Sequence, residues 1–581
     1  MSFDPSSYGF DRFLRYDDMV AWLEQVAAQN PHLVDLDTYG HSYQGRKLWI
    51  VAITDKSTGD HDTKPAHWVD ANIHAVEVTG GVAALHLIDH LVRGHRAGDS
   101  RVTTALARRT FYVVPRVNPD GVEAALADRP TFHRSSVRSW PFTDGHRWPG
   151  LHPEDIDGDG RIRTMRIRDD HGAWVEHPDD PRVMMPVPLD GETDRPRYRL
   201  LTEGRLVDHD GFTVPTPRDP SGLDLNRNFP AGWSTGVLGS GDHPMSEPEI
   251  DALVRAVRAR PNVCGYNAFH TFGGVLLRPS STKPDSSLPP ADVWVWNELG
   301  RRGTELTDYK VHSVYEDFTW DKSDVMSGAA DDWAYEHLGV FSWTTEFWDA
   351  IHHATGERAH TFIWYEGPTT AQELAVAKWS DQNAPGSYVG WTSFDHPELG
   401  SVEIGGCDFF SVWTNPPLSL LRKEVEPHAE FAVFQALAAP CLEISKFEAE
   451  SLGSNTWRVR LGISNTGWLP TDVSSWARKN NLVLPITAEI DVDNGSVVGS
   501  PAKAKLGQLE GRVSFRLNGG AMSDGTPDRV LHEWVVSARN GANVTVSVVH
   551  QRAGRVTAQL VLGCSDDRLI RLRGRVRRRT R

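Results

Sequence analysis

Two side chains that commonly bind metal ions, His74 and Glu77, form the pattern H-x-x-E within residues 70–80. A neutral imidazole and a carboxylate are both good zinc ligands, and a catalytic zinc site needs three protein ligands and one open position. The pair lies where a predicted strand gives way to a helix, and open α/β sheets bind ligands at the carboxyl ends of their strands. Because the chain has 25 His and 77 acidic residues, the pair alone does not identify a metal site.

Two further polar residues lie near the ends of predicted apolar strands. His270 ends a strand that begins near Cys264, and Glu346 lies near the end of a strand over residues 341–347. A single buried His is most often hydrogen-bonded within the core. A buried carboxylate without a partner is costly, so Glu346 must be ion-paired, metal-bound or functional.

A third motif, D-L-N-R-N at residues 224–228, places Asn226 beside Arg227. An amide and a guanidinium side by side can form a planar fork for a carboxylate. The motif therefore favours an anionic ligand with a planar head group.

Together with N-P-D-G at residues 118–121, these motifs make the chain resemble the zinc metallocarboxypeptidases, the family of carboxypeptidase A. The motifs occur in the family's order, and the resemblance covers roughly residues 15–350. It implies a carboxypeptidase-like α/β fold, with a mixed sheet flanked by helices, and a hydrolase that uses Zn²⁺ to remove the C-terminal residue of peptides.

The resemblance implies a role for each residue of the motifs. His74, Glu77 and His270 would hold the zinc ion, which lowers the pKa of a bound water to roughly 7. Glu346 would be the general base that takes the proton from this water and delivers it to the leaving amine.

The resemblance also implies substrate contacts. Asn226 and Arg227 look like the clamp on the C-terminal carboxylate, which would make the enzyme an exopeptidase. The family uses an Arg a little after N-P-D-G to polarise the scissile carbonyl, and here Arg134 is favoured over Arg138.

Two positions depart from the family's pattern. Counted back without a gap from Glu346, the family's mobile substrate-binding Tyr falls on Asp324, and the closest Tyr upstream is Tyr315. The same register puts Asp331 at the floor of the family's specificity pocket, the position that sets the preferred C-terminal residue of the substrate. An acidic residue there resembles the members of the family that prefer C-terminal Lys or Arg. The alternative is that Asp331 caps a helix N-terminus.

The first half of a calcium-binding loop lies at residues 155–160, with Asp155, Asp157 and Asp159 at positions 1, 3 and 5 and a Gly at position 6. Position 12 is Arg166, where an EF-hand needs a bidentate Glu, so the segment is not an EF-hand. The alternatives are a one-sided Ca²⁺ site completed by distant ligands and an Asp/Gly turn without an ion.

Strand-like and helix-like segments alternate from residue 17 to about residue 382, which predicts an α/β domain with a largely parallel or mixed sheet. Residues 122–223 lack this periodicity, and a structureless loop of that length is unusual in a compact domain, so we expect an ordered insertion. The pattern S-E-P-E at residues 246–249 predicts a capping box at the start of a helix.

Apolar residues alternate with polar ones after Pro440, as in the stretch 457–463. Turn signals separate these runs, which is typical of an all-β sandwich. The expected organisation is a catalytic domain over residues 1–438 and a β-sandwich with an Arg-rich tail over residues 439–581.

The formal net charge is −16, and the last 17 residues alone carry +6, which leaves −22 on residues 1–564. An acidic body of this kind disfavours nucleic acid as a partner and is compatible with basic peptides. The four Cys, at positions 264, 407, 441 and 564, lie too far apart in sequence for a thiolate metal cluster or a disulfide framework. The chain shows neither a signal peptide nor a membrane span, so the expected location is the cytoplasm.

The leading functional prediction is a zinc metallocarboxypeptidase whose substrate is a peptide with a free C-terminal carboxylate. One alternative is a zinc-dependent deacylase of N-acyl amino acids, because aspartoacylase-like enzymes share H-x-x-E and the strand-end His. The other is a catalytically silent binding protein on the same fold, which Glu346 and the Asn226–Arg227 pair disfavour because such a protein has no chemical need for a base.

Overall fold

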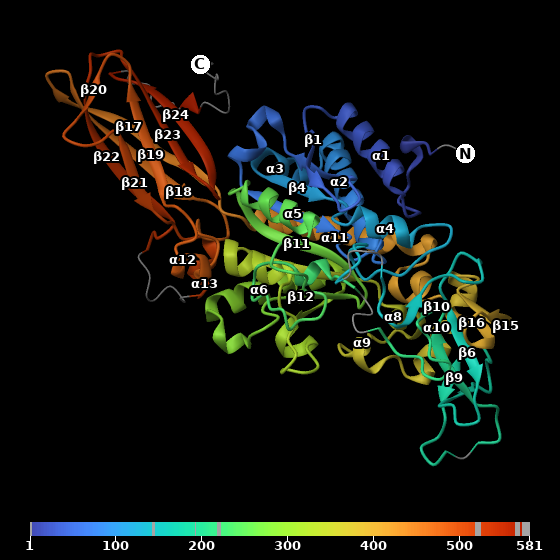
Figure 1. Ribbon diagram of the computed structural model, residues 1–581. Helices are drawn as coiled ribbons and strands as arrows, with labels where there is room; N and C mark the ends of the chain where they lie inside the picture. The colour runs from blue at the N-terminus through green and yellow to red at the C-terminus, as the bar shows by residue number, and fades with distance from the viewer. Residues whose placement is uncertain are drawn as a thin grey trace.

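A mixed sheet of eight strands forms the centre of the N-terminal part of the chain (Figure 1). The computed structural model describes residues 3–141, 146–191, 193–217, 222–517, 525–563 and 570–571. The order of the strands is β1-β2-β4-β3-β11-β14-β12-β13. Their bounds are β1 Val34–His41, β2 Lys47–Ile53, β3 Ala66–Ala71, β4 Thr110–Val114, β11 Val263–Thr271, β12 Val275–Arg278, β13 Lys310–Ser313 and β14 Phe341–Phe347. The predicted α/β class with a mixed sheet is confirmed.

Three neighbouring strands of this sheet, β3, β11 and β14, run parallel to one another. Parallel strands end at the same edge of a sheet. His74, His270 and Glu346 therefore come to one edge although they are far apart in the chain, and His270 and Glu346 are direct partners in the β11–β14 register.

Helices cover both faces of the sheet. Strands that are buried on both faces have few polar residues, because neither face meets solvent. In β3, Trp68 enters the core beneath α5 and α7, whereas the adjacent Val69 enters the larger core beneath α1, α2, α3, α6 and α11. The bounds are α1 Tyr16–Gln29, α2 Thr79–Ala97, α3 Ser100–Arg108, α5 Pro248–Arg258, α6 Pro290–Thr307, α7 Ala330–Trp333 and α11 Leu418–Ala438.

The predicted capping box at residues 246–249 is wrong. Pro248 occupies the first turn of α5, so the N-cap is Glu247, and its side chain makes no capping hydrogen bond. The Ser246 hydroxyl instead donates to Glu247 Oε1 and accepts from Asn228 Nδ2.

Residues within the predicted insertion form short antiparallel strands. One sheet has the order β15-β16-β6-β9-β7-β8, and β5 pairs with β10 beside it. Two of these strands, β15 and β16, follow the catalytic strands in sequence and were not expected to join the insertion. The bounds are β5 Gly150–Pro153, β6 Thr164–Arg168, β7 Trp174–Glu176, β8 Met184–Pro186, β9 Tyr198–Thr202, β10 Gly204–Val207, β15 Tyr388–His396 and β16 Gly400–Cys407.

The C-terminal part is a sandwich of two antiparallel sheets, β17-β18-β22-β20 and β21-β19-β23-β24-β25, whose inner faces share one apolar core. The predicted all-β sandwich is confirmed. Its strands are β17 Leu442–Gly453, β18 Thr456–Asn465, β19 Ile486–Val492, β20 Ser496–Val498, β21 Lys503–Gly507, β22 Arg529–Ser537, β23 Asn543–His550, β24 Gly554–Val561 and β25 Ile570–Arg571. The proposed division after residue 438 falls between the end of α11 and the start of β17.

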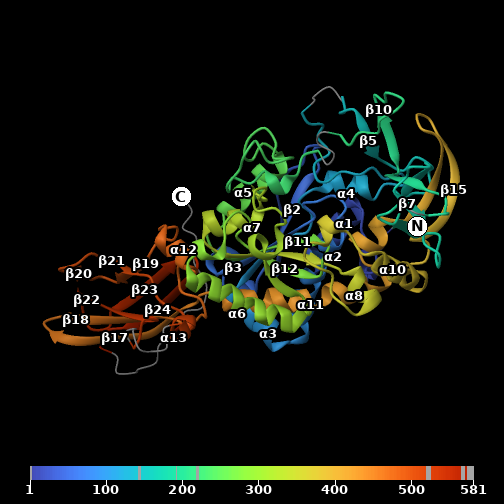
Figure 2. The same ribbon diagram turned by 90° about the horizontal axis from the view of Figure 1, so that it is seen from below.

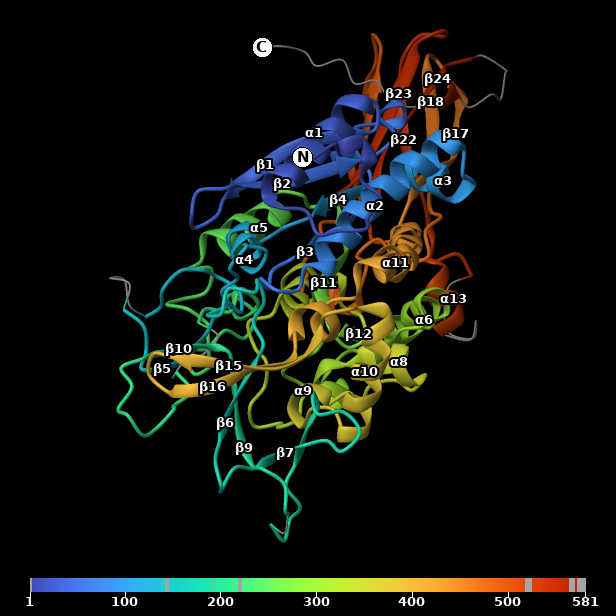
Figure 3. The same ribbon diagram turned by 90° about the vertical axis from the view of Figure 1, so that its right-hand side faces the viewer.

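The sandwich and the insertion lie at opposite ends of the molecule in all three views (Figures 1, 2 and 3). The sandwich packs at the amino-terminal end of β11, where Cys264 Sγ donates to the backbone carbonyl of Arg552 at 3.0 Å. The Arg552 guanidinium donates to the carbonyls of Leu338 and Gly339, just before β14. On α6, Asp292 accepts from the backbone amides of Ser475 and Trp476.

Within the described ranges, no helix is both long and apolar enough to cross a bilayer. Cys264, Cys407 and Cys441 are free thiols. Cys564 and the Arg-rich tail, apart from Ile570 and Arg571, lie outside the described residues.

Candidate active site

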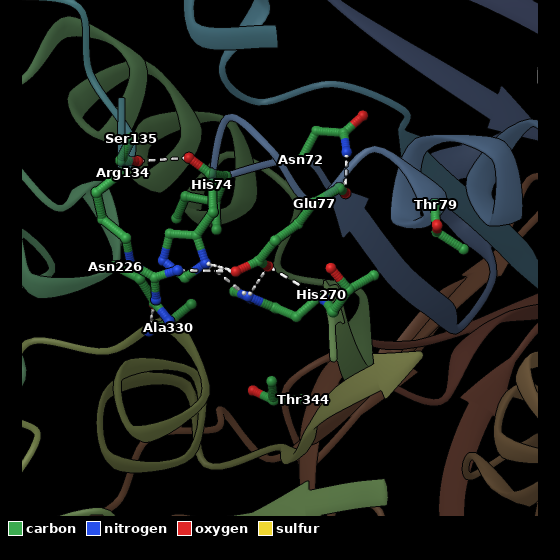
Figure 4. Close-up of polar contacts among 12 residues, drawn as sticks. Asn72, His74, Glu77, Thr79, Arg134, Ser135, Asn226, His270, Ala330 and Thr344 are labelled. Carbon is green, nitrogen blue, oxygen red and sulfur yellow. Dashed lines mark hydrogen bonds and ion pairs between the residues drawn. The ribbon is translucent and has the colours of Figure 1, made fainter. Parts of the chain in front are cut away.

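The structure brings His74, Glu77 and His270 into one buried cluster at the carboxyl edge of the sheet (Figure 4). His74 and Glu77 lie on the turn between β3 and α2, and His270 lies near the end of β11. Glu77 Oε1 is 2.8 Å from His74 Nδ1, Glu77 Oε2 is 3.0 Å from His270 Nδ1, and the two imidazole nitrogens are 3.1 Å apart.

Two imidazoles and one carboxylate are the donor set of a catalytic zinc site, and their ligand atoms all lie within 4.8 Å of one another. Burial lowers the pKa of His270, which favours the neutral ring that a metal ion binds. Burial would raise the pKa of Glu77, but the charge of His74 and the hydrogen bonds to His270 and His74 outweigh it and hold this pKa well below the usual value. The residues present therefore fit a zinc ion.

Asp224 was not among the predicted site residues, although it opens the D-L-N-R-N motif. Its Oδ1 is 3.1 Å from His74 Nε2, and its pKa lies well below the usual value because the charges of His74, Arg227 and Arg134 outweigh the effect of burial. A carboxylate on the far nitrogen of a ligating His fixes the ring and its tautomer. No spacing in the sequence links Asp224 to His74, 150 positions away, so its place in the motif did not point to this contact.

Arg134 faces the same cluster. Its Nη1 donates to Glu77 Oε1 at 2.9 Å, and its Nε donates to Asp224 Oδ2 at 3.3 Å. The alternative, Arg138, is held by Glu247 and Asp242 instead. Arg134, and not Arg138, therefore lies against the His74–Glu77–His270 cluster.

Asn226 and Arg227 lie in a short 3₁₀ turn, Leu225–Arg227, beside this cluster. The backbone amide of Ala330, at the start of α7, donates to Asn226 Oδ1 at 2.9 Å, and within the described residues no hydrogen bond occupies the NH₂ group of Asn226. Arg227 Nη1 donates to its neighbour's carbonyl at 2.8 Å, and among the described residues Arg227 has no ion-pair partner. Both side chains thus keep donors for a ligand.

Glu346 lies on β14, opposite His270, and is 5% exposed. Its Oε2 has no hydrogen-bond partner in the described part of the chain, and such a buried orphan acceptor calls for an explanation. Burial raises the pKa of Glu346 well above the usual value, and the negative charges of Glu77 and Asp331 add to this effect. A carboxylate with a raised pKa is suited to accept and return a proton near neutral pH.

Asp331 lies in the first turn of α7 but is not its N-cap, which is Ala329. The Thr344 hydroxyl donates to Asp331 Oδ2 at 3.2 Å, and the amide of Asp332 donates to Oδ1 at 3.0 Å. Asp331 is 3% exposed and has no salt bridge to a basic side chain within the described ranges. The capping alternative is wrong, and Asp331 is a buried carboxylate without a cation.

Asp324, the register position of the family's Tyr, lies in an irregular segment between η6, Val314–Phe318, and α7. The upstream Tyr315 packs beneath the ammonium group of Lys322. A different Tyr, Tyr365, lies near the site. Its pKa is raised, mainly by burial; the positive charge of Arg227 opposes this rise, and the negative charge of Asp324 adds to it. Tyr365 therefore lies within electrostatic reach of the candidate clamp, from a position after Glu346 in the chain.

The three Asp residues of the calcium motif also come together within 4.8 Å. Asp155 accepts from the amides of Gly158 and Gly160, and Asp159 pairs with Arg163. Arg166 points to Glu176 and Glu403 and not into the loop. These contacts are those of an Asp/Gly turn, and calcium binding stays a prediction.

A family model described as zinc carboxypeptidase matches residues 19–146 and 194–364, about half of the chain. The chain belongs to the zinc carboxypeptidase family. Enzymes of this family use zinc, and the His74–Glu77–His270 cluster in this chain is a group of side chains that could hold such an ion. A second family model, described as a domain of unknown function, matches residues 441–561.

Curated zinc carboxypeptidases align with parts of this chain. The zinc carboxypeptidase of Saccharothrix mutabilis subsp. capreolus is 31% identical over 132 residues, which cover 23% of this chain and 29% of that protein. Carboxypeptidase B of Bos taurus is 22% identical over 357 residues, 59% of this chain and 65% of that protein. The chain thus spans less than two thirds of each of these relatives.

Solved structures also match parts of this chain. The structure of bovine thrombin-activatable fibrinolysis inhibitor covers 64% of this chain and 97% of that chain, with 17% identity and a TM-score of 0.36. The carboxypeptidase A of Helicoverpa armigera covers 66% of this chain and 76% of that chain, with 17% identity and a TM-score of 0.37.

Proposed function

We propose that the chain is a zinc metallocarboxypeptidase that hydrolyses the C-terminal peptide bond of its substrate with Glu346 as general base. The observation that carries the proposal is the buried, unpartnered Oε2 of Glu346, on the strand position that pairs with His270. A bound zinc ion supplies Lewis acidity and lowers the pKa of a coordinated water.

The side chains of the site then act in sequence. Arg134 donates to the scissile carbonyl oxygen and stabilises the negative charge that develops there. Glu346 accepts a proton from the attacking water and passes it to the leaving nitrogen, so the carboxylate is regenerated when the amine departs. Burial of Glu346 raises the pKa of this carboxyl group, which makes the carboxylate a stronger base for the first of these transfers.

Asn226 and Arg227 supply the exopeptidase restriction. The free donors of the Asn226 amide and the Arg227 guanidinium fit the two oxygens of a terminal carboxylate. A charge-assisted pair of this kind rejects a neutral terminus because the guanidinium would be left without its anion.

The test of this function is the hydrolysis of matched peptides with a free or an amidated C-terminus. We expect release of the terminal residue from the free acid, with kcat/KM at least about 100-fold higher than for the amide, since loss of a hydrogen-bonded charge pair costs several kcal/mol. Zinc content is measured on the same preparation, with about one ion per chain expected. Hydrolysis of N-acyl amino acids but of no peptide would favour the deacylase alternative.

Asp331 is the proposed determinant of a preference for C-terminal Arg or Lys. The carboxylate is buried without a salt bridge to a cation, and its charge raises the pKa of Glu346, so the two groups lie within electrostatic reach of each other. A basic side chain of the substrate would neutralise it.

We expect Asp331→Asn to lower kcat/KM for peptides ending in Arg by about 100-fold and to leave peptides ending in Phe nearly unchanged. The matched control is Asp332→Asn, because Asp332 is equally buried on the same helix but its carboxylate accepts from the amide of Ser281. A wild-type preference for Phe over Arg would contradict this assignment.

A further inference from the structure

Trp348, two residues after the proposed base Glu346, has a backbone conformation that non-glycine residues rarely adopt. Its φ of 71° lies in the left-handed region, and its side chain is fully buried. A bulky residue in this region is strained, and such strain persists only where the surrounding contacts hold it. Strained residues cluster at active sites, so the contacts that hold Trp348 are candidates for a role in the reaction.

Hydrogen bonds hold the backbone of Trp348 on both sides. The Trp348 amide donates to the hydroxyl oxygen of Tyr309 at 2.8 Å, and the amide of Gly273 donates to the Trp348 carbonyl at 2.8 Å. Gly273 lies between β11 and β12, which are the two neighbours of β14 in the sheet. The chain that leaves β14 is thus tied to the chain that leaves β11 just after His270.

Four side chains form a closed network around this strained residue, the Trp348 network of Tyr309, Trp348, His353 and Glu424. The Tyr309 hydroxyl, which accepts from the Trp348 amide, donates to Glu424 Oε1 on α11. Glu424 Oε2 is 3.3 Å from His353 Nε2 on α8, Ala350–Thr355. The His353 ring stacks on the Trp348 indole with the centroids 4.4 Å apart, so the contacts return to the residue from which they start.

The carboxylate of Glu424 orients the Tyr309 hydroxyl. Tyr309 is buried, and the Glu424 side chain is 10% exposed. Burial would raise the pKa of Glu424, but hydrogen bonds from His353 and Tyr309 outweigh it and hold this pKa below the usual value. Glu424 is therefore ionised at neutral pH, and a hydrogen bond to a charged acceptor in surroundings of low dielectric is strong. Because the Tyr309 proton is directed to Glu424, a lone pair of the hydroxyl oxygen is left for the Trp348 amide.

The Trp348 network acts on Glu346 through the backbone. Tyr309 and Trp348 belong to the larger core beneath α11, whereas the charges that act on Glu346 include those of Glu77 and Arg134 in the active site. Glu346 Oε2 has no hydrogen-bond partner in the part of the chain that the structure describes. The direction of this carboxylate therefore depends on packing and on the course of the backbone at the end of β14.

We propose that Tyr309 and Glu424 are positioning residues, which hold Trp348 in its left-handed conformation and so fix the place of Glu346 for proton transfer. This inference rests on the proposed function. A misplacement of about 1 Å caused by a distant substitution can lower a rate by about 100-fold. The network would thus be needed for turnover although it lies outside the residues that touch substrate.

The first test is Tyr309→Phe, which removes only the hydroxyl and leaves the Trp348 amide without its acceptor. We expect kcat for a peptide substrate to fall by about 10- to 100-fold, while KM and zinc content stay nearly unchanged. The matched control is Tyr335→Phe in η7, Ala334–Leu338, before the other end of β14. Tyr335 is also buried, and its hydroxyl donates to Asp292 Oδ2 at 2.8 Å. This variant should melt at a lower temperature but keep its kcat.

A second pair of variants tests the path through Glu424 and remains informative if Tyr309→Phe does not fold. Glu424→Gln keeps an oxygen that accepts from the Tyr309 hydroxyl, so kcat should stay within about threefold of the wild-type value. Glu424→Ala removes this acceptor and should lower kcat by about 10- to 100-fold. All rates are measured on zinc-loaded protein below the melting temperature of every variant.

Normal kcat in Tyr309→Phe and Glu424→Ala would overturn the positioning role and leave the proposed function standing. Equal losses of kcat in Tyr309→Phe and Tyr335→Phe, or in Glu424→Gln and Glu424→Ala, would contradict it as well. If the wild type hydrolyses no peptide, the proposed function fails, and crystal structures of the wild type and Tyr309→Phe test the network. A Trp348 with negative φ and a Glu346 carboxylate displaced by about 1 Å in the variant would support it, and superimposable structures would refute it.

Discussion

Glu346→Gln is expected to retain zinc and to lower kcat by about 10² to 10⁴, the usual contribution of a general base. Gln has nearly the same shape as Glu, so the packing of β14 against β11 and β12 should persist. What the variant loses is the acceptor that takes a proton from water, since an amide is not basic. KM for the substrate should change little, because the residues proposed to hold the terminal residue, Asn226, Arg227 and Asp331, are unchanged.

The matched control is Glu249→Gln. Glu249 is also buried, burial raises its pKa to about 7, and its Oε2 likewise lacks a hydrogen-bond partner in the described part of the chain, but it lies on α5. Zinc content, thermal unfolding and steady-state kinetics are measured on both variants. Full turnover by Glu346→Gln would refute the assigned base, and equal losses in both variants would point to a general effect of removing a buried carboxylate.

His270→Ala should lose both the zinc ion and detectable turnover while the chain stays folded. The variant removes one of three proposed ligands, and two ligands do not make a catalytic zinc site. The fold should persist because Glu77, the buried charge of the cluster, retains His74, Arg134 and the amide of Thr271 as partners. The free energy of unfolding of the metal-free protein should fall by about 1–3 kcal/mol, the cost of a lost buried hydrogen-bond partner.

His67→Gln provides the control, because His67 is buried on β3 near the opposite end of the same sheet. It should keep zinc and activity. In the wild type, added zinc should raise the melting temperature, since a ligand that binds the folded state alone stabilises it. In His270→Ala this rise should largely disappear. A His270→Ala protein with one tightly bound zinc and normal turnover would remove His270 from the ligand set.

Much of the site could be predicted because its residues lie at the ends of apolar strands. His74 and His270 are separated by 196 positions, and His270 and Glu346 by 76, yet parallel strands end at one edge, so a pattern of strands is enough to bring them together. Asp331 was proposed from a register counted back from Glu346, and its negative charge acts on Glu346.

What could not be predicted depends on pairings between distant segments. β16 joins the insertion through β6, and Arg166 is held by Glu403, 237 positions away. No local pattern encodes such a partner. Asp224 was overlooked because a carboxylate at the far nitrogen of a ligand has no spacing rule, and the capping box at Ser246 failed because a Pro shifted the first turn of α5.

The hydrogen bonds that attach the sandwich to the catalytic part affect how the molecule unfolds. Arg552 satisfies the carbonyls of Leu338 and Gly339, just before the strand that carries Glu346, and Asp292 receives two amides from the C-terminal part. Separating the two parts would leave these buried polar groups without hydrogen-bond partners. Each lost partner costs about 1–3 kcal/mol of folding free energy. The chain is therefore expected to melt in a single cooperative transition, so that a substitution in the sandwich core lowers the temperature at which hydrolysis fails.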